Sequence, residues 1–495
     1  MRFLRAWTRT PFLILAAFPL AAGCGGSGSG SDAGGGSAAD GAAEEEAVPL
    51  SEQGTYLNIV VPSVVKPEED LRLRLRVVTQ VGLPDYDFDG VFRIEGRGNV
   101  EFPDPMTLDP DPDGFYETDG IRFHDPGVQF LRGTVPGDTV QALANPVNVA
   151  RDPAYRIYWG DLNGHTDLSS GNRAPGVYYW YAKAVALLDF VALTDNDAWE
   201  DKILEDETFE EIAERALGDA EVEGRFVGIP AFEWTSPRYG NRLVYFRGIP
   251  AHLPTVASGV DTPAKLRAAL PDGAVVAIAH PSGSKTNNPV DPASVDDEDL
   301  VEIYSSVGIF EAPGTHRAST QEKAGSFVTD LLRAGRTPGF IANGDSRLTT
   351  PGNPRGFAYG DFPYGGGLTA VLANELTREA ILDALLAGRC YGTTGRRYLL
   401  EFTVDGQPMG SHLEVPSGHE ASVYGSLGST TNWVRVEIVG PRGPIAVLTP
   451  EPGRSDVVEL PAKTPPVTNP TFVYLRGVDE FGGMAWSSPV YLAPQ

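Results

Sequence analysis

Residues 158–171 read YWGDLNGHTDLSSG, and this stretch has the form of a strand that ends in a metal-binding loop. Residues 157–159 are apolar enough for a buried strand. Asp161, Asn163 and His165 then alternate, so at the strand end they can point to one side, where an i, i+2 pair can hold a metal ion. A pair of histidines would need His at 163, where the chain has Asn163. The question is whether this is a working metal hydrolase.

Length and charge limit the classes of function. The chain has 495 residues, which predicts about two or three domains. With 41% hydrophobic and 21% charged residues, the composition is that of a globular protein. The formal net charge of −27 repels nucleic acid and anionic membranes, so we expect no nucleic-acid partner. A small anionic or phosphorylated substrate would need a bound cation or a local basic patch.

Residues 1–24 are similar to a bacterial lipoprotein signal peptide. Three arginines precede an apolar run, residues 11–20, which is too short for a typical membrane span. Small residues then precede Cys24, the expected lipidation site; the alternative is a plain secretory signal with a chance cysteine. Gly25 does not resemble an inner-membrane retention signal. We therefore expect a cell-envelope protein that is held by a lipid anchor alone, at the outer membrane on its periplasmic or surface side.

The rest of the chain divides into segments that differ in composition and in the pattern of their apolar residues. Residues 25–50 are rich in Gly, Ser and Ala and predict a flexible linker. Short strands and turns over 51–150 predict an N-terminal β-sandwich-like domain, and the same pattern over 398–495 predicts a second module. Over 151–397, strand-like runs alternate with helical ones, including a helix expected from the capping box of Ser319 and Glu322. This alternation predicts a parallel α/β barrel or sheet.

Carboxylates and histidines follow successive predicted strands of this α/β region, where a βα barrel places its active residues. They are Asp161, Asn163 and His165; Asp195, Asn196 and Asp197; Glu233; His280; Glu302; and Asp345 and Arg347. Each residue alone is as readily explained as a loop cap or a hydrogen-bonded core residue. Their joint position at strand ends is typical of a metal centre.

Five segments together carry a family resemblance. They read GDLNGHT (160–166), DFVALTDND (189–197), FEWTS (232–236), AIAHP (277–281) and NGDSR (343–347), and 376–397 and 483–492 match as flanking signatures. This spacing resembles the PHP superfamily (polymerase and histidinol phosphatase-like), above all a branch of secreted bacterial proteins of unknown function. The resemblance covers about residues 155–494. It implies a distorted PHP-like (β/α) barrel, flanked here by the two β-sandwich-like modules, with clustered divalent metals and phosphoesterase activity.

The resemblance also implies which residues hold metal. The family would have histidines at 163, 196 and 347 and near 241, where this chain has Asn163, Asn196, Asn241 and Arg347. The ligands that remain are His165, Glu233, His280 and Asp345. Asparagine replaces imidazole poorly on Zn²⁺, and arginine cannot ligate a metal. We therefore expect one divalent ion (Zn, Mn or Mg) or none.

Two functions stay open at this point. The first is a metal-dependent hydrolase of phosphoesterase type with a reduced site, in which Asp195 or Asp197 is the candidate base and Arg347 holds the anionic group of the substrate. The second is a catalytically degenerate lipoprotein that binds an anionic or sugar-like ligand without turnover. A purely structural envelope protein is a third, weaker alternative. The sequence identifies no substrate.

Overall fold

The computed structural model describes residues 55–86, 88, 91–96, 98–103, 107–108, 115–135, 141–218, 221–283, 289–295, 298–354, 364–451 and 456–495. The predicted signal peptide, Cys24 and the predicted linker lie outside these residues. In the described part of the chain, no helix is long and apolar enough to cross a membrane.

The N-terminal strands form two antiparallel sheets with a shared core. One sheet has the order β1 (Thr55–Val60), β3 (Leu71–Thr79), β7 (Phe115–Phe123), β5 (Val100–Glu101). The other has the order β10 (Gln141–Leu143), β9 (Leu131–Thr134), β4 (Phe92–Gly96), β6 (Thr107–Leu108). A smaller third sheet consists of β2 (Val64–Val65), β11 (Val147–Val149) and β8 (Gly127–Gln129). Alternate residues of β3, such as Leu73 and Leu75, are fully buried and pack in one cluster with Phe92 of β4.

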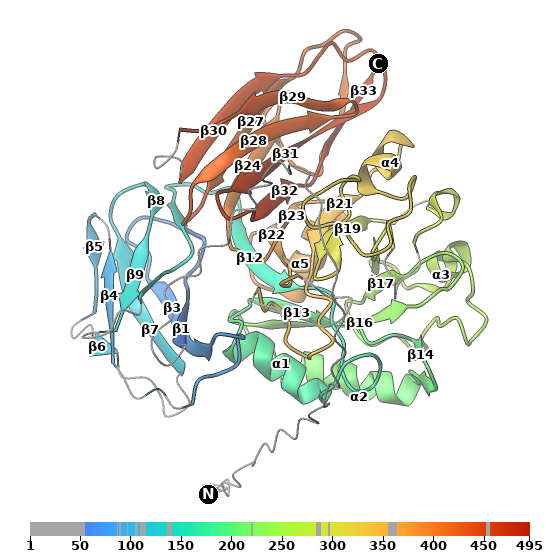
Figure 1. Cartoon of the computed structure of the whole chain (residues 1–495), viewed down its shortest axis with the longest axis horizontal. Coiled ribbons are helices and arrows are strands. Elements are labelled where there is room, and N and C mark those ends of the chain that lie inside the picture. Colours follow the sequence, from blue (N-terminus) through green and yellow to red (C-terminus); the bar gives the residue numbers. More distant parts are fainter. Residues whose placement is uncertain are drawn as a thin grey trace, which may run out of the picture. The chain divides into compact units, whose positions relative to one another are not determined.

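A mixed sheet of 16 strands carries the candidate site (Figure 1). Its main path runs β20 (Gly308–Ile309), β19 (Leu300–Ser305), β18 (Val275–Ile278), β17 (Arg242–Tyr245), β16 (Val227–Trp234), β13 (Phe190–Leu193), β12 (Arg156–Asp161), β22 (Leu368–Ala373), β23 (Cys390–Thr393), β32 (Met484–Ser487), β31 (Thr471–Asp479), β28 (Trp433–Gly440), β29 (Gly443–Leu448). Off this path, β21 (Gly339–Ala342) pairs with β19, and β33 (Val490–Pro494) joins β31 to β26 (His412–Val415). The sheet is a half-barrel that continues directly into the C-terminal strands.

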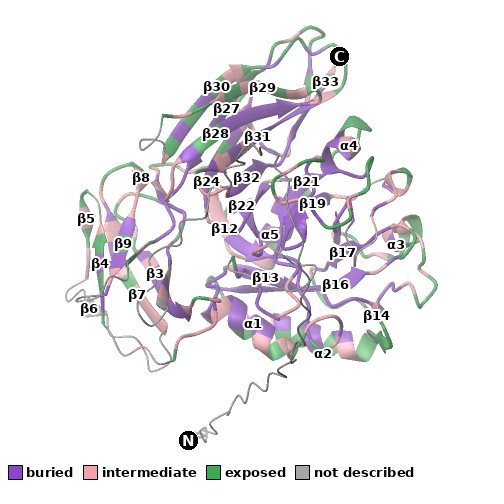
Figure 2. Cartoon of the chain, viewed as in Figure 1, coloured by how far each residue is buried: buried purple, intermediate pink, exposed green. Residues whose placement is uncertain are grey.

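Helices cover the outer side of the half-barrel. α1 (Pro175–Ala184) and α2 (Asp206–Leu217) lie side by side against β13 and β16 (Figure 1). The strands are buried throughout, whereas α2 is buried on one face and exposed on the other (Figure 2). α3 (Pro263–Ala269) begins at the predicted cap, where Thr262 accepts from the backbone N–H of Lys265, and α5 (Arg378–Leu386) packs on β22.

The prediction of a parallel α/β barrel is right only in part, because the structure is rich in strands and poor in helix. Parallel pairing with intervening helices holds for β12, β13 and β16. β17 then returns antiparallel to β16, since residues 235–241 are too few for a crossover helix. The helix predicted from Ser319 is also wrong. α4 spans only Val328–Arg333, and Gly325 before it has a φ of 88°, outside the helical region.

The C-terminal strands form a second pair of sheets. β25 (Gln407–Pro408), β24 (Leu399–Val404), β27 (Ser422–Gly428) and β30 (Val457–Lys463) make one sheet, which packs on β28 and β31. Phe402 and Leu427 from the first sheet share a core with Trp433 and Leu475 from the second. Since β23 pairs with β32, no break in sheet hydrogen bonding separates these strands from the half-barrel.

Candidate metal centre

The four retained ligand positions lie at one edge of the half-barrel. His165 follows β12, Glu233 ends β16, His280 follows β18, and Asp345 follows β21. These strands run in the same direction, because β12, β13 and β16 are parallel and β18 lies two antiparallel steps from β16. Their carboxyl ends therefore meet at one edge, and the side chains converge there. All four are buried, with exposed fractions of 1–2%.

The four side chains form a connected cluster. Nε2 of His165 lies 3.1 Å from Oδ1 of Asp345 and 3.5 Å from Oε2 of Glu233. Nε2 of His280 lies 3.7 Å from Oδ2 of Asp345. Both imidazoles thus direct the same nitrogen toward the carboxylates.

Backbone conformation contributes to this convergence. His280 and Asp345 both have a φ of 45°, a left-handed conformation that is uncommon for residues with a side chain. Such strained positions persist where the surrounding structure fixes them, and they gather at functional sites.

Glu302 of β19 holds His280 in place. Its Oε2 lies 2.8 Å from Nδ1 of His280 and accepts from the His280 backbone N–H at 3.2 Å. Its Oε1 accepts from Nδ2 of Asn163 at 3.2 Å and of Asn343 at 3.0 Å. A carboxylate on the far nitrogen of an imidazole is the usual outer-sphere support of a histidine metal ligand. The sequence predicts Glu302 only as one of several candidate residues of a metal centre; its support of His280 and the role of Asn343 are not predicted. A glutamate in the fully buried strand LVEIYS was the available signal.

The asparagines at substituted positions support other residues. Asn163 donates to Glu302 and accepts from Oγ1 of Thr194 at 3.0 Å. Nδ2 of Asn241 donates to Oε1 of Glu233, so the other oxygen of Glu233 faces His165. Nδ2 of Asn196 donates to Oγ1 of Thr235, and its buried Oδ1 has no hydrogen-bond partner. Asn196 is therefore the asparagine that keeps an acceptor for a ligand.

The two predicted bases have their oxygens engaged in the loops. Asp195 accepts from the backbone N–H and hydroxyl of Thr166 at 2.7 and 2.5 Å and from Oγ of Ser169 at 2.5 Å. Asp197 accepts from the N–H of Thr235 and of Val256, both at 2.8 Å. Burial raises the pKa of Asp197 to about 6. Both carboxylates fix the loops around the cluster, and this geometry leaves little room for a role as base.

Charges within the cluster shift the pKa values of its members. Burial alone would lower the pKa of His280, but the carboxylates of Glu302 and Asp345 outweigh it and raise this pKa to about 9. The pKa of His165 is raised as well, because the hydrogen bond to Asp345 and the charge of Glu233 exceed the effect of burial. Burial raises the pKa of Glu233, whereas both histidines hold the pKa of Asp345 below its usual value against the effect of burial.

The pKa of His280 predicts a pH-dependent stability of the metal-free protein. A histidine whose folded pKa is raised stabilises the fold below its unfolded pKa of 6.5, and this contribution is lost as pH rises through about 9. We expect the unfolding free energy to fall by up to about 3 kcal/mol more in the wild type than in His280→Gln between pH 6 and 10. Urea unfolding in the presence of EDTA, repeated across this pH range, measures the unfolding free energy of both proteins. An equal decrease with pH in the wild type and in His280→Gln would refute the prediction.

Asp161 ties the two loops of the cluster together. Its carboxylate accepts from the backbone N–H of Asn163, Gly344 and Gly352 at 3.1, 2.9 and 2.7 Å. Burial raises the pKa of Asp161 to about 7 against these three donors. The carboxylate thereby fixes the chain before His165 to the chain before Asp345.

Gly344 has no room for a side chain, which gives a second prediction. A Cβ at 344 would lie 2.3 Å from Oδ2 of Asp161. We expect Gly344→Ala to destabilise the protein by about 1–3 kcal/mol in urea unfolding, as overpacking does. Gly176→Ala is the control, because a Cβ there meets no atom within 4 Å and the residue lies in α1. It should stabilise by about 0.5–1 kcal/mol. Equal effects of both substitutions would contradict the packing at Gly344.

The donor types of the cluster suit a divalent ion, and some pairwise distances between them are close to those of ligands around one ion. Ligands about 2.0–2.1 Å from a tetrahedral ion lie about 3.3 Å from each other. The contacts of His165 and His280 with the carboxylates, at 3.1–3.7 Å, bracket that value. Oε2 of Glu233 and Oδ2 of Asp345 are buried without a hydrogen-bond partner, as expected of ligand atoms. Within the described ranges, however, no group of three or more His, Cys, Asp and Glu side chains is placed to hold a metal ion. Binding of an ion to the four side chains would therefore need side-chain movement.

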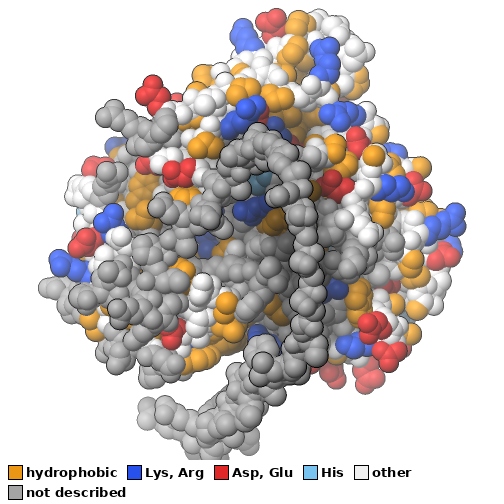
Figure 3. Space-filling model, in the orientation of Figure 1, with side chains coloured by type: hydrophobic (Ala, Val, Ile, Leu, Met, Phe, Trp, Pro, Cys, Tyr) orange, Lys and Arg blue, Asp and Glu red, His pale blue; other side chains and the backbone are white. Residues whose placement is uncertain are grey.

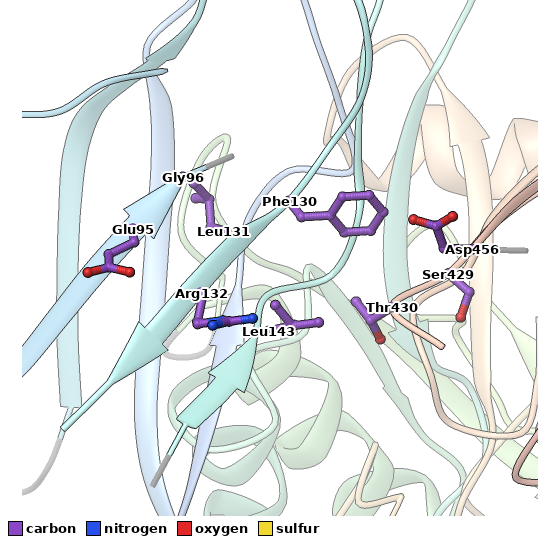
Figure 4. A pocket seen from close by; sticks show the side chains of 9 residues that line it. All are labelled: Glu95, Gly96, Phe130, Leu131, Arg132, Leu143, Ser429, Thr430 and Asp456. Atoms are coloured by element: carbon purple, nitrogen blue, oxygen red, sulfur yellow. The ribbon is translucent and has the colours of Figure 1, made fainter. Parts of the chain in front are cut away.

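Two hollows elsewhere in the described residues lack this chemistry. One, of about 360 Å³, has Glu95 at one end and Asp456 at the other, with Phe130 and Leu143 between them (Figure 4). A larger one, of about 760 Å³, lies between the end of α4 and the strands β26 and β33. It contains one histidine, His412, whose ring stacks on Tyr491. Neither hollow gathers buried carboxylates and imidazoles.

Comparisons with known proteins give similarity without an established function. A family model described as a protein of unknown function (DUF3604) matches residues 305–415. An uncharacterized Chlamydia pneumoniae protein is 25% identical over 77% of this chain and 64% of its own length. One from Chlamydia muridarum is 30% identical over 39% of this chain and 34% of its own length. This chain thus spans less than two thirds of these curated relatives.

A solved structure is also similar at a low level. It is a two-domain Bacteroides vulgatus protein, described as containing a predicted PHP-like metal-dependent phosphoesterase. It is 12% identical to this chain and covers 68% of it and 95% of its own length, with a TM-score of 0.36. At this similarity, an argument for function must rest on the site itself.

Proposed function

We propose that the chain is a metal-dependent hydrolase of small anionic esters, with one divalent ion held by His165, Glu233, His280 and Asp345. The observation that carries the proposal is the buried cluster, in which two Nε2 atoms face two carboxylate oxygens without hydrogen-bond partners. Burying four ionisable groups is costly unless they are paired or coordinate a metal. When bound, a divalent ion lowers the pKa of a water and supplies hydroxide near neutral pH.

The remaining residues prepare the site. Glu302 and Asn241 orient His280 and Glu233, and Asp161 holds together the loops that carry His165 and Asp345. In the proposal, Oδ1 of Asn196, which is buried and has no hydrogen-bond partner, accepts from the substrate or the attacking water. Acidic and basic side chains are interspersed on the face of the molecule that Figure 3 shows, so attraction of an anion depends on a local cation. Arg347, two residues after Asp345, is that cation in the proposal.

The test of the hydrolase proposal combines metal content with turnover. A soluble form that begins at Gly25 is loaded separately with Zn²⁺, Mn²⁺ or Mg²⁺, dialysed, and assayed for bound metal and for hydrolysis of 4-nitrophenyl phosphate. We expect one equivalent of at least one metal and turnover that EDTA abolishes. Less than one equivalent of every metal, with no turnover, would refute the proposal.

A second candidate is binding without turnover. The direct contacts of His165 and His280 with carboxylates favour it, because protonated imidazoles neutralise the buried acids without an ion. Metal content and turnover separate the two candidates, since binding without turnover needs no metal. A metal-free protein that binds an organic anion but hydrolyses no ester would support binding alone.

A further inference from the structure

An arginine and a tryptophan from separate loops stack beside the buried cluster. The guanidinium carbon of Arg347 lies 4.6 Å from the ring centre of Trp199. Both side chains are partly exposed, in contrast to the buried ligands. The charge of Arg347 is close enough to lower the pKa of both His165 and Asp345. The stacked pair is therefore partly exposed and close to the candidate metal centre.

Trp199 lies on a hairpin that is fixed to the site. The hairpin consists of β14 (Ala198–Trp199) and β15 (Lys202–Ile203). Nζ of Lys202 donates to the backbone oxygens of Asp167 and Ser169, both at 2.8 Å, within the loop that carries His165. At the base of the hairpin, the backbone N–H of Leu204 donates to the backbone oxygen of Asp197 at 3.0 Å. These bonds fix the Trp199 ring relative to the cluster.

A second observation points to a ligand at this place. Oδ1 of Asn196 is an acceptor without a partner in a side chain with an exposed fraction of 4%. Asn196 lies three residues before Trp199 and forms a parallel bridge with Glu233. A substrate hydroxyl or a water would satisfy this oxygen.

We infer that Arg347, oriented by Trp199, binds the oxyanion of the substrate, so that the site selects organic phosphates or carboxylates over neutral esters. A guanidinium presents paired N–H donors that match two oxygens of an oxyanion, and stacking on an aromatic ring limits its orientations. Lysine at 347 would supply the charge without the paired donors. The inference rests on the proposed function only for the reaction that follows binding, and Trp199 acts as a positioning residue.

The test measures binding of non-reacting anions, so it is independent of turnover. Purified protein, with and without Zn²⁺, is titrated with phenylphosphonate, benzoate and neutral benzamide by calorimetry and tryptophan fluorescence. We expect at least one anion to bind more tightly than benzamide, and the preferred anion identifies the oxyanion class. Arg347→Gln should weaken that anion about tenfold or more, and Arg347→Lys should weaken it less. Arg132→Gln, which changes an exposed arginine of β9, should have no effect.

The position of Trp199 is tested in the same assay. Trp199→Ala should weaken the anion severalfold and Trp199→Phe should restore it, because phenylalanine keeps a ring under the guanidinium. Metal content should be the same in every Arg347 and Trp199 variant. Wild-type affinity in Arg347→Gln, or no preference for anions in the wild type, would overturn the inference. If either of these results is found in a protein that binds one metal and turns over ester, the hydrolase proposal stays intact. If the protein binds anions but no metal, only the hydrolase proposal is refuted.

Discussion

Replacing Glu233 by alanine is expected to remove the bound ion and to lower ester turnover at least about a hundredfold. Oε2 of Glu233 lies 3.5 Å from Nε2 of His165 and has no hydrogen-bond partner, while Asn241 holds the other oxygen. The substitution therefore removes a carboxylate ligand and leaves the outer support without its acceptor. In other metal sites, loss of an outer-sphere partner alone typically lowers metal affinity or activity by about ten- to hundredfold. Loss of a ligand should therefore cost at least about as much.

The control for Glu233→Ala is Glu211→Ala, on the exposed face of α2. Metal content and hydrolysis of 4-nitrophenyl phosphate are measured for both variants at equal folded concentration. The control should match the wild type in both respects. A Glu233→Ala protein that keeps its ion and its turnover would show that Glu233 is no ligand.

Replacing Glu311 by alanine is expected to destabilise the fold by about 3–5 kcal/mol, as removal of one partner from a buried ion pair does. Glu311 follows β20 and has an exposed fraction of 1%. Its Oε1 accepts from the hydroxyl of Tyr474 at 2.6 Å and from Nη1 of Arg476 at 2.7 Å. Its Oε2 accepts from the indole N–H of Trp486 at 2.9 Å. The substitution removes this acceptor from three donors of the C-terminal strands, of which Arg476 keeps its ion pair with Glu437.

Asp70→Ala is the matched control for Glu311→Ala. Asp70 pairs with Arg122 at 2.7 Å, but both side chains are well exposed, so the loss should be much smaller than that of Glu311→Ala. Chemical unfolding followed by tryptophan fluorescence measures both variants. If Glu311→Ala costs no more than Asp70→Ala, the buried network does not join the half-barrel to the C-terminal strands as the contacts indicate.

The sequence located the candidate site better than it predicted the fold around it. Position after short apolar runs predicts a wider set of polar residues at strand ends, and the family resemblance selects His165, Glu233, His280 and Asp345 among them. Strand direction then brings these four to one edge. The predicted barrel is too regular, because β17 returns antiparallel after β16 and interrupts a parallel order that resumes only at β18, β19 and β21. The short connection before Arg242 forces an antiparallel return, and a pattern of apolar runs does not distinguish that from a parallel strand.

The supports of the site were not predictable in the same way. Glu302 acts through Asn163 and Asn343, which lie 139 and 41 residues away along the chain. The pairing of Arg347 with Trp199 also depends on loop geometry that no local pattern specifies. The sequence predicts Asn163 and Asn241 as lost ligands, whereas in the structure Asn163 donates to Glu302, the support of His280, and Asn241 donates to Glu233 of the cluster. These asparagines therefore have a structural role that a count of missing histidines hides.

X-ray absorption spectroscopy of the Zn²⁺-loaded protein tests the central claim most directly. If the four buried side chains share one ion, the spectrum will show nitrogen and oxygen ligands at about 2.0–2.1 Å with the outer-shell scattering of two imidazoles. That imidazole scattering should fall by about half in His280→Gln. A spectrum of hydrated zinc without imidazole scattering, or a protein that loses its zinc on dialysis, would contradict the claim.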